Sequence, residues 1–204
     1  MKLLLTAFEP FGKLRVNASE EVVKKIVHRN GRSHACEIIA QVLPTEYSAS
    51  AGQIRRLIRK HRPDALLCLG VAAARDAICL ERFALNVDEE KLPDNAGRIA
   101  SGKPIRRGGP EAYRSTLPID KMLRALQRRR IRARISNSAG TFVCNHAFYV
   151  ARDEVERLGL RIPCGFIHVP DLKGRRRRSR GMPLSKMVLG IECCIGILGS
   201  SLEQ

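Results

Sequence analysis

Cys144 lies in a stretch of small and polar residues, 136–145, which connects an apolar segment to a helical pattern. A cysteine in the first turn of that helix meets the partial positive charge of the helix dipole, which favours a thiolate. An ordinary thiol is only a few per cent ionised at neutral pH, so a nucleophilic cysteine needs such help. The other six cysteines lie in apolar patterns typical of packing residues: Cys36, Cys68, Cys79, Cys164, Cys193 and Cys194. Position in the sequence therefore favours Cys144 as the candidate nucleophile.

A histidine and a carboxylate could complete a catalytic set with this cysteine. His168 is followed by Val169 and Pro170, which end an apolar segment. A lone histidine there is more often a core residue than a catalyst, but an imidazole can also hold a thiolate and protonate a leaving amine. Glu81 lies in another apolar segment, where a carboxylate is costly unless it is paired. Its pattern allows an ion pair with Arg75 or Arg82, or the orientation of His168.

Alternating apolar segments and helical patterns position these residues. Strands are predicted at 3–8, 38–43, 65–70, 78–87, 131–135 and 162–169, and helices around 17–27, 54–60, 119–126, 147–158 and 184–198. This alternation indicates βαβ units. We predict one catalytic domain over residues 1–204, an α/β fold in which helices cover both faces of a mostly parallel, twisted sheet in a three-layer α/β/α sandwich. Ligands bind beyond the carboxyl ends of strands in such sheets, and the three candidates are expected there.

Two segments depart from the alternation. Residues 88–113 lose periodicity and contain several glycines and prolines, so we expect an extended loop or arm of functional importance. Residues 172–182 form a predicted basic loop. No run of about 20 apolar residues predicts a membrane span, and the seven cysteines lack the spacing of a disulfide framework, which favours a cytoplasmic protein with reduced thiols.

The formal net charge of +17 raises a different class of function. Arginine clusters at 124–134 and 173–180 could bind RNA through phosphate contacts, or serve a basic esterase that resembles peptidyl-tRNA hydrolase. Aromatic residues are only 4% of the chain and are not interleaved with the arginines, which argues against base stacking. We therefore keep RNA binding and the esterase as alternatives and favour a solvated face or loop.

An ordered series of motifs resembles the pyroglutamyl peptidase I family of cysteine peptidases. The series is FEPFG at 8–12, the segment around Glu81, NVDEEKLPDNAG at 86–97, SNSAGTFVCN at 136–145 and FIHVP at 166–170. The resemblance implies hydrolysis of the amide bond after an N-terminal pyroglutamyl residue through a thioester, with neither a cofactor nor a metal. It also implies a soluble homo-oligomer, a tetramer or a dimer, that acts on pyroglutamyl peptides.

The same resemblance implies roles for individual residues. Cys144 matches the nucleophile, His168 the general base and Glu81 the carboxylate. Arg75 is expected at the active-site mouth or near the oxyanion. The residues expected against the pyroglutamyl ring are Phe8 and Phe11, with help from Phe142 and Val143, and main-chain groups near Val71 are expected to bind the lactam. An apolar slot accepts a neutral lactam and penalises the ammonium group of an ordinary N-terminus, because burying a charge is costly.

Overall fold

A six-stranded sheet forms the centre of the computed structural model, which describes residues 1–30, 36–174 and 181–202. The strand order is β2-β1-β3-β10-β4-β9. The six strands are β1 (Lys2–Phe8), β2 (Glu37–Leu43), β3 (Ala65–Val71), β4 (Ile78–Glu81), β9 (Ala133–Ser136) and β10 (Cys164–Val169). β1, β3 and β10 read as almost unbroken apolar runs because both of their faces are covered by helices.

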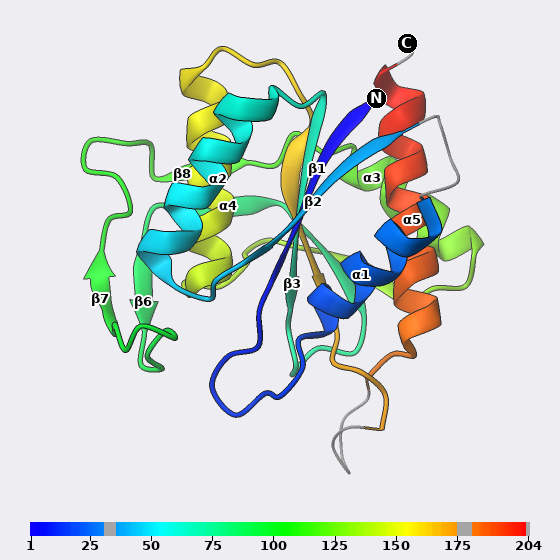
Figure 1. Ribbon diagram of the computed structural model, residues 1–204, viewed down its shortest axis with the longest axis horizontal. Helices are drawn as coiled ribbons and strands as arrows, with labels where there is room; N and C mark the ends of the chain where they lie inside the picture. Colours follow the sequence, from blue (N-terminus) through cyan, green and yellow to red (C-terminus); the bar gives the residue numbers. More distant parts are fainter. Residues whose placement is uncertain (31–35, 175–180, 203–204) are drawn as a thin grey trace.

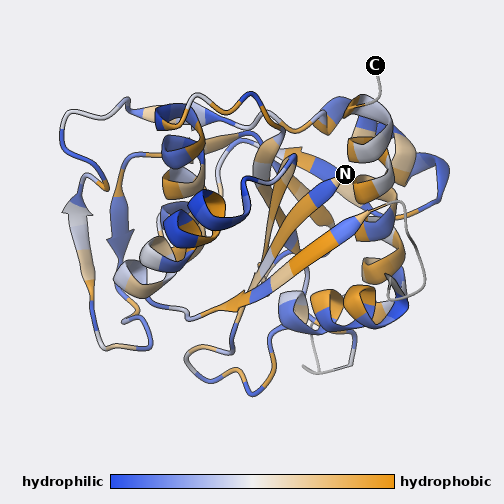
Figure 2. Cartoon of the chain, turned by 45° about the horizontal axis from the view of Figure 1, so that its top comes forward, coloured by the Kyte–Doolittle hydropathy of each residue, from blue (hydrophilic) through white to orange (hydrophobic). Residues whose placement is uncertain are grey.

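Five helices cover the two faces of this sheet (Figure 1). α1 (Ala18–Asn30), α3 (Ile119–Arg128) and α5 (Leu184–Leu202) lie on one face, and α2 (Tyr47–His61) and α4 (Val143–Arg157) lie on the other. Each face has its own apolar core, and the central strands are mostly hydrophobic (Figure 2). The predicted three-layer α/β/α arrangement is therefore confirmed.

The sheet is mostly parallel, but its direction reverses once. β2, β1, β3 and β10 pair in parallel, and β4 pairs in parallel with β9. β10 and β4 are antiparallel, with Ile167 opposite Leu80 and His168 opposite Cys79. The end of β4 therefore lies level with the middle of β10, and the expectation that Glu81 shares the carboxyl edge of a parallel sheet with His168 is wrong.

The segment 78–87, predicted as one strand, divides at Arg82. β4 ends at Glu81, and β5 (Phe83–Leu85) leaves the main sheet to pair with β8 (Ala112–Arg114). The intervening arm, predicted to be a loop, contains a second small sheet of β6 (Asp88–Glu90) and β7 (Ala100–Lys103). Figure 1 shows β6 and β7 outside α2 and α4. These strands are only three or four residues long, too short to show an alternating pattern.

Polar side chains stabilise the start of α1. The Asn17 side-chain oxygen accepts the Ser19 N–H at 3.0 Å and caps α1. Glu20, in the first turn of the same helix, forms an ion pair with Lys24. The basic loop is closed at its base by a bridge between Leu172 and Met182, and its residues 175–180 lie outside the described part of the chain.

α5 is long and apolar enough to cross a membrane by length and composition alone. Its buried side chains, which include Met187, Ile191 and Leu198, pack against the core on the α1 and α3 face. A core helix of a soluble protein passes the same test of length and composition. The packing is therefore that of a core helix.

Candidate active site

His168 and Glu81 meet on the α2 and α4 face of the sheet. The Nδ1 atom of His168 lies 2.8 Å from Oε1 of Glu81. The contact is diagonal, because His168 faces Cys79 across the antiparallel pair and Glu81 lies two residues further along β4. Glu81 is fully buried and His168 is 4% exposed. The carboxylate thus fixes the orientation of the imidazole ring.

Arg75 provides the charge that a buried carboxylate requires. Its guanidinium donates to Oε1 of Glu81 at 2.6 Å, to Oγ of Ser136 at 3.3 Å and to the carbonyl of Ser138 at 3.2 Å. Of the two partners left open by the sequence, Arg75 and not Arg82 binds Glu81; Arg82 donates instead to Asn137. Arg75 therefore neutralises Glu81 and fastens the turn that leads to α4.

The thiol of Cys144 reaches the same place from α4. A Cβ atom added to Gly70 would lie 2.9 Å from the sulfur and 2.8 Å from the ring of Phe166. Gly70 is paired with His168 across β3 and β10, and the Phe166 and His168 rings are 4.8 Å apart. The sulfur, the imidazole and the glycine backbone therefore converge, and only glycine at position 70 leaves room for this approach.

Burial opposes ionisation of this thiol. Desolvation raises the pKa of Cys144 to about 12, the charge of Glu81 adds to the increase, and Arg75 counteracts it. The helix dipole acts on the Cys144 thiolate with partial charges only, whereas desolvation acts on its full charge, so a thiolate in the resting protein stays a prediction. Cys144 keeps partial exposure, so a substrate can reach it.

Two partly buried aromatic rings lie beside the nucleophile candidate. Phe142 immediately precedes α4, and its ring centroid is 5.8 Å from that of Phe11. Tyr47 packs edge-on against Phe142 at 5.7 Å. The other three residues expected near the ring are buried: Phe8 contacts Phe166, Val71 ends β3, and Val143 lies in the core. Phe11 and Phe142 are therefore the rings best placed to line a slot.

No group of three or more His, Cys, Asp or Glu side chains arranged to hold a metal ion was found in the described ranges. The acidic and imidazole groups near Cys144 are already engaged with one another or with arginine. The groups at this place that can take part in acyl transfer are the thiol, the imidazole and the carboxylate.

Comparison with known proteins assigns this arrangement to a family. A family model described as pyroglutamyl peptidase matches residues 1–198. The chain belongs to the pyroglutamyl peptidase family. A pyrrolidone-carboxylate peptidase from Gloeobacter violaceus is 42% identical over 205 residues, which cover 98% of each chain. One from Bacillus licheniformis is 44% identical over 172 residues, 84% of this chain and 79% of the relative.

Solved structures of pyroglutamyl peptidases have the same fold. Pyroglutamyl peptidase I from Bacillus amyloliquefaciens superposes with a TM-score of 0.91 at 36% identity, covering 97% of this chain and 94% of that one. Pyrrolidone carboxyl peptidase from Pyrococcus furiosus gives a TM-score of 0.93 at 31% identity, covering 99% and 100%. The predicted family, fold and enzyme class are therefore confirmed, and the comparisons lend no support to the RNA-binding or esterase alternatives.

The arm of this pyroglutamyl peptidase holds the aromatic slot in place. Asn95 donates to the side chain of Glu9 at 2.8 Å and to the carbonyl of Pro10 at 3.0 Å. Asp94 accepts the N–H of Tyr47 at 3.0 Å. The PDN and FEPFG motifs, 80 residues apart in the sequence, are thus two sides of one contact, and the turn that carries Phe11 depends on the arm.

A buried polar cluster at the start of α4 was not predicted from the sequence. His146 lies 2.8 Å from Asp88 and packs edge-on against Tyr47. The Arg98 guanidinium lies 4.8 Å above the Tyr47 ring and 3.9 Å from Asp88. The sequence contained a signal for this cluster, because Asn145 and His146 are polar residues in the otherwise apolar first half of α4. Their partners in the arm could not be identified without long-range pairing.

Hydrogen bonds on both sides of Cys144 connect it to residues 85–89, which lead from β5 into the arm. The carbonyl of Thr141 accepts the Glu89 N–H at 3.1 Å, and the Thr141 hydroxyl donates to the Glu89 carbonyl. Asn145 is fully buried and makes three hydrogen bonds, two with the backbone of Leu85 and one to the Val87 carbonyl, at 2.8 to 3.1 Å. The arm therefore fixes the backbone that presents the thiol.

We expect Asn145→Ala to lower both stability and activity. The change leaves the Leu85 N–H and the carbonyls of Leu85 and Val87 without this partner in a partly buried place, which costs about 2 to 4 kcal/mol. A loosened thiol should reduce kcat/KM by about 10- to 100-fold, since small misplacement of reacting groups is costly. Thermal melting and pyroglutamyl amide hydrolysis measure the two effects. Asn137→Ala, which removes an exposed contact to Arg82, is the matched control and should leave both nearly unchanged.

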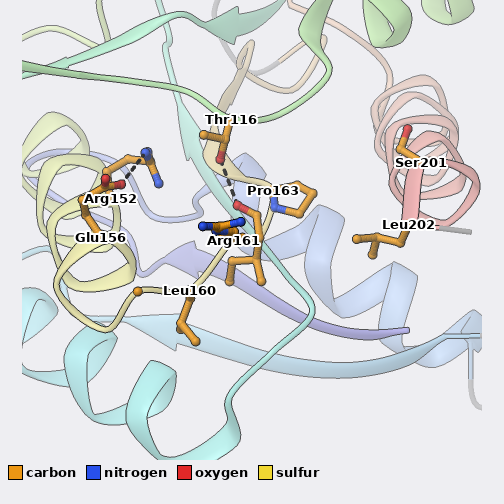
Figure 3. A pocket seen from close by; sticks show the side chains of 10 residues that line it. Thr116, Arg152, Glu156, Leu160, Arg161, Pro163, Ser201 and Leu202 are labelled. Atoms are coloured by element: carbon orange, nitrogen blue, oxygen red, sulfur yellow. Dashed lines mark hydrogen bonds and ion pairs between the residues drawn. The ribbon is translucent and has the colours of Figure 1, made fainter. Parts of the chain in front are cut away.

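A separate hollow of about 580 Å³ lies near the far end of α4 (Figure 3). Arg152, Glu156 and Arg161 contribute the charges of its lining, and the Arg152 guanidinium is bonded to Glu156 and to the Arg114 carbonyl. Cys144 is at the other end of α4, about 12 to 18 Å along the helix from Arg152 and Glu156 at 1.5 Å per residue. This hollow therefore takes no part in the arrangement around the thiol.

Proposed function

We propose that Cys144, His168 and Glu81 form the catalytic triad with which this pyroglutamyl peptidase cleaves the bond after an N-terminal pyroglutamyl residue. The observation that carries the assignment is the convergence of the Cys144 sulfur and the Glu81-bound imidazole beside Gly70. A nucleophile, a base and a group that orients the base are the elements of a triad, whichever fold supplies them.

In the first step the thiol loses its proton as it attacks. The raised pKa means that Cys144 waits as a neutral thiol. The free nitrogen of His168 takes the proton while the sulfur bonds to the pyroglutamyl carbonyl carbon, and Glu81 stabilises the imidazolium that forms. The carbonyl oxygen becomes an oxyanion. The Cys144 N–H, in the first turn of α4 where N–H groups lack intrahelical acceptors, is positioned to receive it.

The tetrahedral intermediate then collapses and expels the amine, and hydrolysis afterwards releases the acyl group from the sulfur. His168 returns its proton to the departing amine as the carbon–nitrogen bond breaks, which leaves a thioester on Cys144. Water then attacks the thioester with His168 as base, and the products are pyroglutamate and the regenerated thiol. In this scheme Arg75 pairs with Glu81 and holds it in place, and it does not contact the oxyanion.

The aromatic pair gives a physical basis for the choice of substrate. A pyroglutamyl ring is neutral and can lie against the packed rings of Phe11 and Phe142, whereas an ordinary N-terminus would carry an ammonium group into an apolar slot. Phe8 and Val143 lie in the apolar core that Phe142 packs against, and Val71 lies in the core of the other face, which Phe11 packs against. The test is a set of fluorogenic amides: the pyroglutamyl amide should be cleaved, and the prolyl, glutamyl and alanyl amides should not. Equal cleavage of all four would refute the assigned specificity.

Glu81→Gln should lower kcat by about 100-fold, because an amide cannot stabilise the imidazolium and the tautomer of His168 is no longer fixed. The variant should also lose about 1 to 3 kcal/mol of stability, since Arg75 remains partly buried without its partner. Asp76→Asn, which removes a carboxylate from the same connection but does not contact His168, is the control. Unchanged turnover in Glu81→Gln would reduce Glu81 to a structural ion pair.

We also propose that the enzyme is cytoplasmic and self-associates. All seven cysteines are free thiols, which suits a reducing compartment. The family resemblance implies a tetramer or a dimer, and α5 exposes Leu189 and Leu202, each about 40% accessible. Light scattering after size-exclusion chromatography should give a mass of two or four chains; a monomer at micromolar concentration would contradict this proposal.

A further inference from the structure

A group of exposed cations lies next to the strand end that carries His168. It consists of Arg130, Arg132, Arg134, Lys173 and Lys186, which we call the basic rim. All of these except Arg134 line a hollow of about 390 Å³, together with Gly181, Met182 and Pro183. The described lining of this hollow contains no acidic side chain. The triad mechanism gives these cations no task.

The sheet register places the rim close to the candidate catalytic histidine. Arg134 is paired with Cys79 across β9 and β4, and Cys79 is paired with His168 across β4 and β10. Two strand spacings separate the backbones of Arg134 and His168, which amounts to about 10 Å. The neighbours of Arg134 along β9, Ala133 and Ile135, pack into the core on the α1, α3 and α5 face. Arg134 therefore projects from the face that carries His168 and Glu81.

The segment that follows His168 completes the rim. The Lys173 N–H donates to the Met182 carbonyl, and the Met182 N–H donates to the Asp171 carbonyl. Arg132 donates to the Gly181 carbonyl at 3.4 Å and, like Arg134, lies 3.5 Å from Asp76. β9, the turn before β4 and the base of the loop after β10 are thus held together. The rim is therefore part of the structure at this edge of the sheet.

We propose that the basic rim binds acidic side chains in the leaving part of the substrate, so that the enzyme prefers pyroglutamyl peptides with Asp or Glu a few residues after the scissile bond. This inference rests on the proposed function. An extended peptide spans about 3.3 to 3.6 Å per residue, so three residues cover about the 10 Å that separates the backbones of His168 and Arg134. The described lining lacks aromatic rings for base stacking, which favours a peptide carboxylate over a nucleic acid.

The test compares three pyroglutamyl tetrapeptide amides that differ only in the third residue after the scissile bond: Asp, Ala or Lys. At low salt we expect kcat/KM to be about tenfold higher for the Asp peptide than for the Lys peptide, and to approach equality at 0.5 M NaCl, because attraction between exposed charges is screened. The difference should lie in KM. The Ala peptide reports on the triad itself, and failure to cleave it would refute the proposed function and not merely the preference.

Two double variants identify the responsible residues. Arg134→Gln with Lys186→Gln should reduce the Asp-to-Lys ratio to about twofold, each value being normalised to the Ala peptide. Arg56→Gln with Lys60→Gln removes the same charge from the distant basic face of α2 and should keep the ratio near tenfold. Equal cleavage of the Asp and Lys peptides by the wild type would overturn the proposal. So would an equal loss of preference in both variants, or RNA binding that disappears in the rim variant without any peptide preference.

Discussion

Cys144→Ala is expected to abolish pyroglutamyl amide hydrolysis, with a fall in kcat of at least about 10⁴-fold, because removal of a covalent nucleophile leaves only binding and oxyanion stabilisation. Cys144→Ser should be almost as inactive. A hydroxyl is less acidic than a thiol, and burial at this site already disfavours the ionised form of the nucleophile. Both variants should fold normally, because the side chain is nearly isosteric with serine and no described hydrogen bond depends on it. The measurement is single-turnover release of pyroglutamate.

Cys193→Ser is the matched control for this prediction. Cys193 is also partly exposed, but it lies on α5 beside the groove toward α3, away from the Glu81 and His168 pair. Its replacement should leave kcat within about twofold of the wild type. If Cys144→Ala retained turnover while Cys193→Ser lost it, the assignment of the nucleophile would be refuted.

The protonation state of Cys144 can be tested by alkylation. Because burial raises its pKa to about 12, the thiolate fraction is small at neutral pH and grows as the pH rises. Iodoacetamide labelling of Cys144, followed by mass spectrometry, should therefore accelerate continuously from pH 6 to pH 9. A plateau already reached at pH 6 would show a preformed thiolate and imidazolium pair, and the first mechanistic step would then be wrong.

The sequence was sufficient for the parts of the site that depend on local pattern. Cys144 follows a glycine turn, with Gly140 at φ +85°, and begins a helix, which the sequence pattern indicates directly. His168 is likewise recognised from an apolar strand ended by proline. The environment of the thiol could not be predicted in the same way. Its desolvation comes from Gly70 and Phe166, which approach it only after β3 and β10 have paired.

Contacts between segments distant along the chain also explain why strand direction and the order of the arm were not predicted. The contact between Glu81 and His168 was anticipated, but it arises from an antiparallel register between two buried strands, and apolar runs carry no information on strand direction. The arm residues Asp88 and Asn95 are polar and lack periodicity, so the sequence indicated a loop. Their order comes from partners on α4 and in the turn after β1. The part of the site that the sequence does not reveal is therefore the part assembled from segments distant along the chain.

His168→Ala should be nearly as damaging as loss of the nucleophile, with kcat reduced by about 10³- to 10⁴-fold. Without the imidazole a neutral thiol of raised pKa has no base to receive its proton, and the amine has no acid to assist its departure. Deletion of the ring also leaves the buried Glu81 with Arg75 as its remaining described partner at Oε1, so melting must be measured alongside activity. His168→Gln preserves more of the volume and separates loss of chemistry from loss of packing.

The double variant distinguishes a catalytic partner from a merely structural neighbour. If Cys144 and His168 act in one proton transfer, each substitution removes the whole step, and Cys144→Ala with His168→Ala should be no slower than Cys144→Ala alone. Independent contributions would instead multiply, which would reduce residual turnover by a further 10³-fold or more. Multiplicative losses, or a His168→Gln variant that keeps more than about a tenth of wild-type kcat, would remove His168 from the mechanism and leave its contact with Glu81 as a structural feature of the sheet.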